Sequence, residues 1–311
     1  MLSNVDNAVM DTTNHSAYPS IASRAPLRIG AYGLVVRDLD RLVDFYSNAV
    51  GLAVLDRTAR SVRLGIDGVV LLELQHRPDA LPDDAATAGL FHTAFLMPTR
   101  QHLAQWHRHS TRIGLPITRT GDHLVNEAIY FDDPEGNGVE CYADRPPETW
   151  CWDDAGRVDI DTGKRVDLEA LSREAAGDGE NWQAPAALRI GHINLRVGDY
   201  AAAEAFYCGA IGLDHTGRRH IDFAGRPNTI TFMSSGRYHH HLAANDFTSR
   251  GAGARDPDRS GLAWFAFDVQ DAATKERVRD RLQKAGVPIS AVPGGLEIQD
   301  PWGTRVRFAS S

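Results

Sequence analysis

Side chains that can do chemistry gather in one stretch of the sequence, GDHLVNEAIYFDDPEGNGVE, which runs from residue 121 to residue 140. His123 and Tyr130 can exchange protons with a bound molecule, and Glu140 offers a carboxylate. Glu140 lies in an otherwise apolar segment, where an unpaired carboxylate would be costly to bury. A second group, YHHHL at residues 238–242, holds three consecutive histidines, which titrate near neutrality and suit proton transfer. These residues mark either part of an active site or the polar edge of an ordinary sheet.

The segment DDPEGNG that precedes Glu140 predicts a tight hairpin, because Asp, Pro, Gly and Asn supply the backbone angles that such a turn needs. DPWG at residues 300–303 repeats the turn without a corresponding glutamate. The turn itself therefore says nothing about function, and the interest lies in the glutamate that follows it.

The elements that carry these residues belong to an internal duplication, which must be recognised before the fold is assigned. RIGAYGLVVRDLDRLVDFYSNAVGL (28–52) aligns without a gap to RIGHINLRVGDYAAAEAFYCGAIGL (189–213). A second pair, GLFHTAFLMP (89–98) and GLAWFAFDVQ (261–270), repeats within the same halves. The chain therefore has two halves, and each half has two units.

Each unit begins with an alternating strand, continues with a helix and ends in short strands separated by Gly, Asp and Pro turns. This order predicts an α+β protein of four βαβββ units. We name them unit 1A (28–76), unit 1B (89–145), unit 2A (189–245) and unit 2B (260–311).

The units predict the domain organisation of the chain. Residues 1–26 are polar and are expected to form a flexible N-terminal lead-in. Residues 27–145 are the first domain and residues 188–311 the second. Residues 146–187 are charged and rich in turn residues, so we expect a connector with one short helix around residues 167–174.

Over residues 27–311 this pattern resembles the vicinal oxygen chelate superfamily, which has the glyoxalase-like fold. The resemblance implies two half-open eight-stranded barrels, in which metal ligands come from the first and last strands of paired units. The superfamily includes isomerases, thiol transferases, dioxygenases and metal-free drug binders, so the fold alone does not give the function.

The positions that correspond to metal ligands in the superfamily differ among the four units. On the first strands they are occupied by Ala31, His92, His192 and Trp264, and on the last strands by Glu73, Glu140, one of the histidines at 239–241, and Arg307. Units 1B and 2A keep ligand types at both positions, whereas unit 1A has lost its histidine and unit 2B has lost both, so His92, His192 and Glu140 are the predicted metal ligands. Two histidines and one carboxylate leave open positions on non-haem Fe(II), and Mn(II) is the other candidate. Either the active barrel pairs unit 1B with unit 2A across the connector, or the motif is vestigial, and the retained histidines favour the pairing.

The opening stretch resembles, at each defined position, the signature of extradiol ring-cleavage dioxygenases of the bacterial catechol 2,3-dioxygenase type. The matching residues are Gly121, His123, Ile129, Tyr130, Asp133, Pro134, Gly136 and Glu140. The resemblance implies that Glu140 binds iron and that Tyr130 and His123 contact the substrate's oxygens.

The resemblance also implies a proton-shuttling histidine on the last strand of the neighbouring unit. Strand alternation would place His239 and His241 on one face and His240 on the other. Alignment of HLAAN with ECYAD favours His241 as this catalytic residue, with His240 as the alternative.

The expected activity is cleavage of a catechol-type ring by dioxygen to give a ring-opened semialdehyde. The expected partners are a small aromatic diol and dioxygen. One alternative is a glyoxalase-type isomerase or lyase, which usually uses two glutamates. Another is a metal-free binding module, which would have lost ligands in every unit. The retained set of His92, Glu140 and His192 disfavours both.

Composition limits the partners and the location. The 33 basic and 41 acidic residues give a net charge of −8, with no basic run that would grip nucleic acid or anionic lipid. No apolar stretch reaches the roughly 18 residues of a membrane span, and the N-terminus lacks a signal-peptide pattern. Three cysteines without a C-x-x-C pair indicate neither a disulfide framework nor a thiolate zinc site. We expect a cytoplasmic homo-oligomer.

Overall fold

The structure, a computed structural model, describes residues 20–161, 163–175, 181–223 and 225–310. Of the predicted lead-in, residues 1–19 lie outside the described residues. Residues 20–26 contain a short 3-10 helix, η2 (Ile21–Arg24), whose first turn is capped by the side chain of Ser20. Ala22 and Ala25 are buried against the rest of the protein.

The first half of the chain forms two βαβββ units, as predicted. Unit 1A contains β1 (Leu27–Val36), α1 (Leu39–Phe45), the π-helix η3 (Tyr46–Val50), β2 (Ala53–Arg57), β3 (Ser61–Ile66) and β4 (Val69–His76). Unit 1B contains β5 (Gly89–Leu96), α2 (Arg100–Arg112), β6 (Arg119–Asp122), β7 (Asn126–Asp132) and β8 (Gly138–Asp144).

The second half repeats this order. Unit 2A contains β9 (Arg189–Arg196), α4 (Tyr200–Glu204), the π-helix η5 (Ala205–Ile211), β10 (Asp214–Phe223), β11 (Arg226–Ser234) and β12 (Leu242–Asn245). Unit 2B contains β13 (Gly261–Val269), α5 (Ala272–Lys284), β14 (Ser290–Val292), β15 (Gly295–Gln299) and β16 (Arg305–Ser310).

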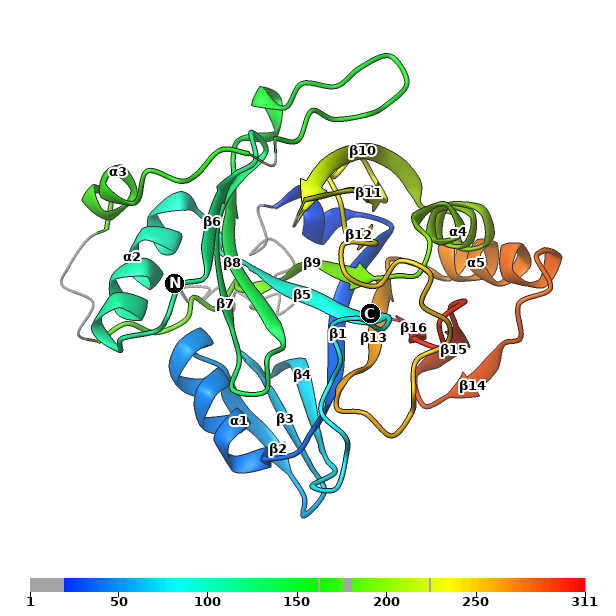
Figure 1. Ribbon diagram of the computed structural model, residues 1–311, viewed down its shortest axis with the longest axis horizontal. Helices are drawn as coiled ribbons and strands as arrows, with labels where there is room; N and C mark the ends of the chain where they lie inside the picture. Colours follow the sequence, from blue (N-terminus) through cyan, green and yellow to red (C-terminus); the bar gives the residue numbers. More distant parts are fainter. Residues whose placement is uncertain (1–19, 162, 176–180, 224, 311) are drawn as a thin grey trace, which may run out of the picture.

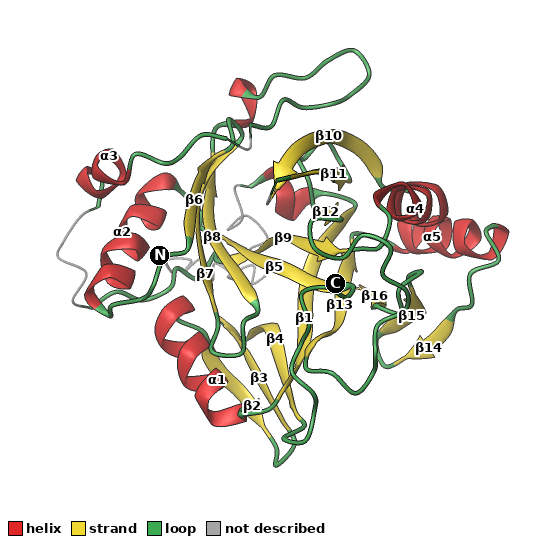
Figure 2. Ribbon diagram, in the orientation of Figure 1, coloured by secondary structure: helices red, strands yellow, loops and turns green. Residues whose placement is uncertain are grey.

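The helices begin where the sequence supplies a capping side chain. The carboxylates of Asp38, Asp199 and Asp271 accept backbone N–H groups at the starts of α1, α4 and α5. Both π-helices end at a glycine with positive φ, Gly51 or Gly212, a conformation that glycine adopts without strain. Figure 2 shows the helices at the two flanks of the molecule, with the strands between them. None of the described helices is long and apolar enough to cross a membrane.

The strands form two eight-stranded sheets, and each sheet takes one unit from each half of the chain. One sheet has the order β14-β15-β16-β13-β1-β4-β3-β2, from units 2B and 1A. The other has the order β10-β11-β12-β9-β5-β8-β7-β6, from units 2A and 1B. In the second sheet, β6–β8 and β10–β12 rise on either side of the central strands β5 and β9 (Figure 1). The predicted fold and the pairing of unit 1B with unit 2A are confirmed. The domain boundaries proposed from the sequence halves stay a prediction.

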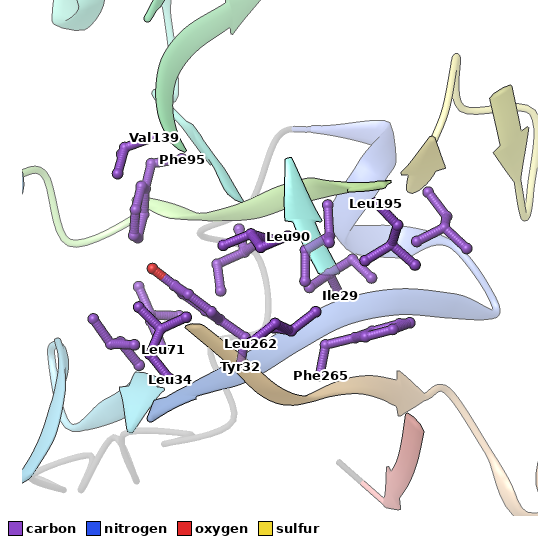
Figure 3. Close-up of a cluster of buried hydrophobic side chains, with 14 of the residues drawn as sticks. Ile29, Tyr32, Leu34, Leu71, Leu90, Phe95, Val139, Leu195, Leu262 and Phe265 are labelled. Atoms are coloured by element: carbon purple, nitrogen blue, oxygen red, sulfur yellow. The ribbon is translucent and has the colours of Figure 1, made fainter. Parts of the chain in front are cut away.

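The central strands of the two sheets pack on each other through one apolar core. Figure 3 shows side chains from β1, β5, β9 and β13 meeting there, among them Ile29, Leu90, Leu195 and Phe265. The ring of Tyr32 packs edge-on against Phe95, with ring centroids 6.5 Å apart. Burial of this apolar surface is the main favourable contribution to folding, and it joins the two sheets into one body.

The connector holds the short helix that the sequence predicts. This helix, α3 (Leu168–Arg173), is capped by Asp167 and lies against α2 (Figure 1). A second short element, η4 (Pro147–Thr149), directly follows unit 1B. Between them, residues 151–161 pass over the second sheet, where Val158 N–H donates to the carbonyl of Thr216.

Candidate metal centre and pocket

Three predicted ligands meet inside the sheet of units 1B and 2A. Oε2 of Glu140 lies 3.0 Å from Nε2 of His92 and 3.1 Å from Nε2 of His192. The two Nε2 atoms are 3.3 Å apart, and all three side chains are buried. Ligand atoms roughly 2.1 Å from one cation, at right angles to each other, lie about 3.0 Å apart. The three atoms therefore fit one face of a single metal ion.

Strand register explains why these residues converge. Ala94 on β5 pairs with His192 on β9 and with Glu140 on β8. Paired residues of adjacent strands point to the same face of a sheet, and so does His92, two residues before Ala94. The small side chain of Ala94, fully buried between the ligands, leaves room for them.

The turn before β8 fixes the start of the strand that carries Glu140. The carboxylate of Asp133 accepts the backbone N–H groups of Glu135 and Asn137, each at 2.9 Å. It also accepts the hydroxyl of Tyr46 at 3.0 Å. Gly136 has a φ of 86°, which suits glycine. The residues of the signature that lie in this turn are therefore structural, and they hold Glu140 in register.

The protonation states of Glu140 and His92 suit a divalent cation. Burial opposes ionisation of Glu140, but the adjacent His192 and His92 hold the pKa of its carboxyl well below the usual range. Burial lowers the pKa of His92 to about 4, although Glu140 partly offsets this. A carboxylate and a neutral imidazole are the states in which these two side chains bind a metal. Within the described part of the chain, no other group of three His, Cys, Asp or Glu residues has this geometry.

Tyr130 and His123 lie together beside the metal ligands. Nδ1 of His123 donates to the carbonyl of Asp161 at 2.6 Å, because a carbonyl can only accept. In a neutral imidazole Nε2 is then an acceptor, and it lies 2.8 Å from the hydroxyl of Tyr130. A Cβ atom on Gly121 would lie 2.4 Å from this Nε2, so the glycine makes room for the ring. The predicted pair thus forms one hydrogen-bonded unit, and burial raises the pKa of Tyr130 well above its ordinary value.

The three consecutive histidines have different surroundings, and the preference for His241 is corrected here. His240 lines the pocket, with its ring centroid 4.2 Å from that of His192. His241 is fully buried and does not line the pocket: its Nδ1 is 2.9 Å from the hydroxyl of Ser234, and its Nε2 donates to the carbonyl of Ala22. The preference came from aligning HLAAN with ECYAD, but in the strand register Ala243 pairs with Asn194 as Glu140 pairs with Ala94, so His241 does not correspond to Glu140.

His239 connects His240 to a partly buried acidic residue, Asp144. Nε2 of His239 lies 2.8 Å from Oδ1 of Asp144, and a carboxylate can only accept, so this nitrogen donates. Burial lowers the pKa of His239, so its ring is neutral and its Nδ1 accepts. Nδ1 of His240, at 2.8 Å, must then be the donor. This series of hydrogen bonds leaves Nε2 of His240 without a proton.

The metal ligands open onto a small cavity of about 70 Å³. Besides the residues already described, its walls contain Phe91, Arg119, Asn126, Ile160, Asn194, Ile221, Ile230, Phe232 and Phe247. The guanidinium of Arg119 lies 4.0 Å from the ring centroid of Tyr130. A mostly apolar pocket with a few polar groups is typical of a small-molecule site.

The other sheet has no ligand set at the corresponding positions, as the sequence indicates. The guanidinium of Arg307 lies over the ring of Trp264, 4.1 Å from its centroid, and its Nε donates to Glu297 at 2.8 Å. Glu73 accepts from Gln75 at 2.7 Å. These residues are held by neighbours within the sheet, and no group of three potential metal ligands forms there among the described residues.

Sequence reasoning missed Asp144, which lies behind the pocket, and several residues that line it. Asp144 lies four residues after Glu140 on the same strand, so the period of two already places both on one face. Asn126 lies four residues before Tyr130 on β7, so these two residues also share a face of the sheet. Ile160 comes from the connector, where no sequence pattern indicated that a residue would line the pocket.

The duplicated units and the ligand-type residues buried between two of them are what the resemblance in the sequence implies. The chain belongs to the Glyoxalase/Bleomycin resistance protein/Dioxygenase superfamily. The family model matches residues 28–141 and 189–308. A protein of Bacillus subtilis (strain 168) named catechol-2,3-dioxygenase is 38% identical to this chain over 280 residues, which cover 88% of this chain and 93% of that protein.

Solved structures share the fold at low sequence identity. Glyoxalase I from Zea mays matches with a TM-score of 0.55 and 19% identity, over 93% of this chain and 94% of that one. A protein from Bacillus subtilis subsp. subtilis str. 168 matches with a TM-score of 0.59 and 12% identity, over 91% of this chain and 84% of that one. At these identities the likeness establishes the fold alone.

Proposed function

We propose that this protein is an Fe(II)-dependent extradiol dioxygenase that opens the ring of a catechol beside its two hydroxyl groups, giving a semialdehyde. The observation that carries the proposal is the meeting of His92, His192 and Glu140 within 3.3 Å of one another, at the base of an apolar pocket. The relative named catechol-2,3-dioxygenase, with its 38% identity, supports the same assignment.

His92, His192 and Glu140 would hold the metal, which when bound supplies open coordination positions for the diol and for dioxygen. The same ligands accept Mn(II). Because the ligands come from units 1B and 2A, the proposed site exists only when both halves of the chain are folded together.

The residues around the ligands would bind the substrate, transfer its protons and exclude water. Tyr130 and His123 offer a hydroxyl and a ring nitrogen that can exchange hydrogen bonds with the oxygens of a diol. His240 presents an unprotonated Nε2 to the pocket, so it can take a proton from the second hydroxyl and return it later in the reaction. The aromatic ring of the catechol would pack against the apolar side chains of Phe91, Phe232 and Phe247, which also exclude water.

A glyoxalase-type isomerase is the competing activity, because glyoxalase I shares the fold. The donor set argues against it, since the site has one carboxylate and adds Tyr130, His123 and His240 around the ligands. An isomerase acts on its substrate without dioxygen, so the two activities separate in one experiment.

The test is an assay of anaerobically iron-loaded protein with catechol, with and without air. We expect the yellow ring-opened product only in air, and loss of the product in Glu140→Gln. The hemithioacetal of glutathione and methylglyoxal is the second substrate in the same assay. Its conversion without air, with catechol unchanged, would overturn the proposal in favour of the isomerase.

A further inference from the structure

The pocket contains a buried amide whose hydrogen-bonding groups are unused. Asn126 is 1% exposed and lines the cavity. Among the residues that the structure describes, neither its Oδ1 nor its Nδ2 has a hydrogen-bond partner. The other asparagine of the pocket, Asn194, accepts from Nδ2 of Asn245 at 2.9 Å. Buried polar groups are nearly always paired, so Asn126 points to a partner that the protein does not itself supply.

The position of Asn126 shows which end of a ligand it would meet. On the inner face of the sheet, Tyr130 stands opposite Glu140, Ala128 opposite Tyr142, and Asn126 opposite Asp144. The side chain of Asn126 is therefore at the end of this face away from the metal ligands. A diol held at the metal end directs the far side of its ring toward Asn126.

The surroundings of Asn126 restrict the chemistry of its partner. The walls of the pocket include Ile160, Ile221 and Ile230, which offer no other polar partner. The only carboxylate opposite Asn126 in the register of β7 and β8 is that of Asp144, which disfavours a negative charge here. The guanidinium of Arg119 lies over Tyr130 at the metal end. An amide offers both a donor and an acceptor, so a neutral hydroxyl or amide group matches it.

We propose, on the basis of the dioxygenase function above, that the substrate is a single-ring catechol with a short, neutral, hydrogen-bonding substituent on the side of the ring away from the diol, and that Asn126 recognises this substituent. The cavity of about 70 Å³ is small, which disfavours a substrate with more than one ring. A site built to hydrogen-bond a substituent discriminates strongly against the analogue that lacks it, because its own polar group is then left unpaired.

The test compares two catechols of nearly the same shape, with a hydroxymethyl or an ethyl group para to one hydroxyl. For the unaltered protein, we expect kcat/KM to favour the hydroxymethyl compound by about tenfold or more. In Asn126→Leu, which keeps the volume but removes both hydrogen-bonding groups, the ratio should fall to about one or below. Ile230→Val, on the same pocket, is the control and should keep the preference for the hydroxymethyl compound.

Unsubstituted catechol and anaerobic calorimetry separate this inference from the proposed function. Failure to cleave any catechol would overturn the dioxygenase function. Calorimetry would still test Asn126 in that case, through the ratio of the dissociation constants of the hydroxymethyl and ethyl compounds in the unaltered protein and in Asn126→Leu. Cleavage of catechol with no preference for the hydroxymethyl compound, or with the same preference in Asn126→Leu, would overturn the inference alone. A faster reaction with the catechol that carries a carboxylate at the same position would also overturn it.

Discussion

Nε2 of His92 lies 3.3 Å from Nε2 of His192, although 100 residues separate the two in the sequence. Their strands, β5 and β9, are the first strands of units 1B and 2A and pair antiparallel at the centre of one sheet. Pairing of the units across the two halves therefore builds one ligand set. Unit 1B contributes His92 and Glu140 to it, and unit 2A contributes His192. The other pairing, of units 1A and 2B, carries Ala31 and Trp264 at the same positions.

We predict that the iron-loaded protein contains about one Fe(II) per chain, because a single ligand set is formed. His92→Ala and His192→Ala should each lower bound iron at least tenfold, since each removes one of three ligands. Elemental analysis after anaerobic loading and desalting measures this. His241→Gln is the control and should keep its iron. Normal iron content in folded His192→Ala would show that the site does not cross the halves.

Tyr130→Phe should lower kcat for catechol at least about tenfold while leaving the iron content unchanged. The reason is that the Tyr130 hydroxyl forms a hydrogen bond with His123, 2.8 Å away, and Tyr130 is not one of the three predicted metal ligands. Steady-state kinetics and metal analysis on the same preparation give both quantities. If the iron were lost with the hydroxyl, Tyr130 would belong to the metal site.

His240→Gln should lower kcat by about two to four orders of magnitude, the usual contribution of a general acid–base group. His241→Gln should leave kcat nearly unchanged, because His241 lies behind the pocket against Ser234 and Ala22. The two variants differ by one position in a run of three histidines, so each controls for the other. The opposite ranking would restore the preference for His241 that the alignment of HLAAN with ECYAD suggested.

The sequence predicted the units from its repeats, and the resemblance to the superfamily and to its signature pointed to the three candidate ligands and to Tyr130 and His123. It could not identify which of the three histidines faces the pocket, because they precede β12, which begins only at Leu242. It also gave no sign that residues 20–26 cover His241, or that Ile160 of the connector lines the pocket. Such contacts depend on how loops return over the sheet, for which the chain carries no periodic signal.

Folding stability should depend on pH through His241. Burial lowers its pKa from the ordinary 6.5 to about 3, so the folded protein binds fewer protons than the unfolded chain between these values. The stability that His241 contributes is therefore present above pH 6.5 and is lost as the pH falls toward 3. Chemical denaturation at pH 7 and pH 5 measures the loss, which should be about 2 kcal/mol smaller in His241→Gln than in the unaltered protein. An identical loss in the two proteins would mean that His241 is protonated in the folded state.

The origin of the oxygen atoms in the product tests the central claim most directly. Iron-loaded protein is mixed with catechol under isotopically labelled dioxygen, and the product is analysed by mass spectrometry. We predict a ring-opened semialdehyde that carries two labelled oxygen atoms, formed by the unaltered protein and absent with Glu140→Gln. An unopened ring, or a dicarboxylate from cleavage between the two hydroxyl groups, in protein that has bound its iron would contradict the account.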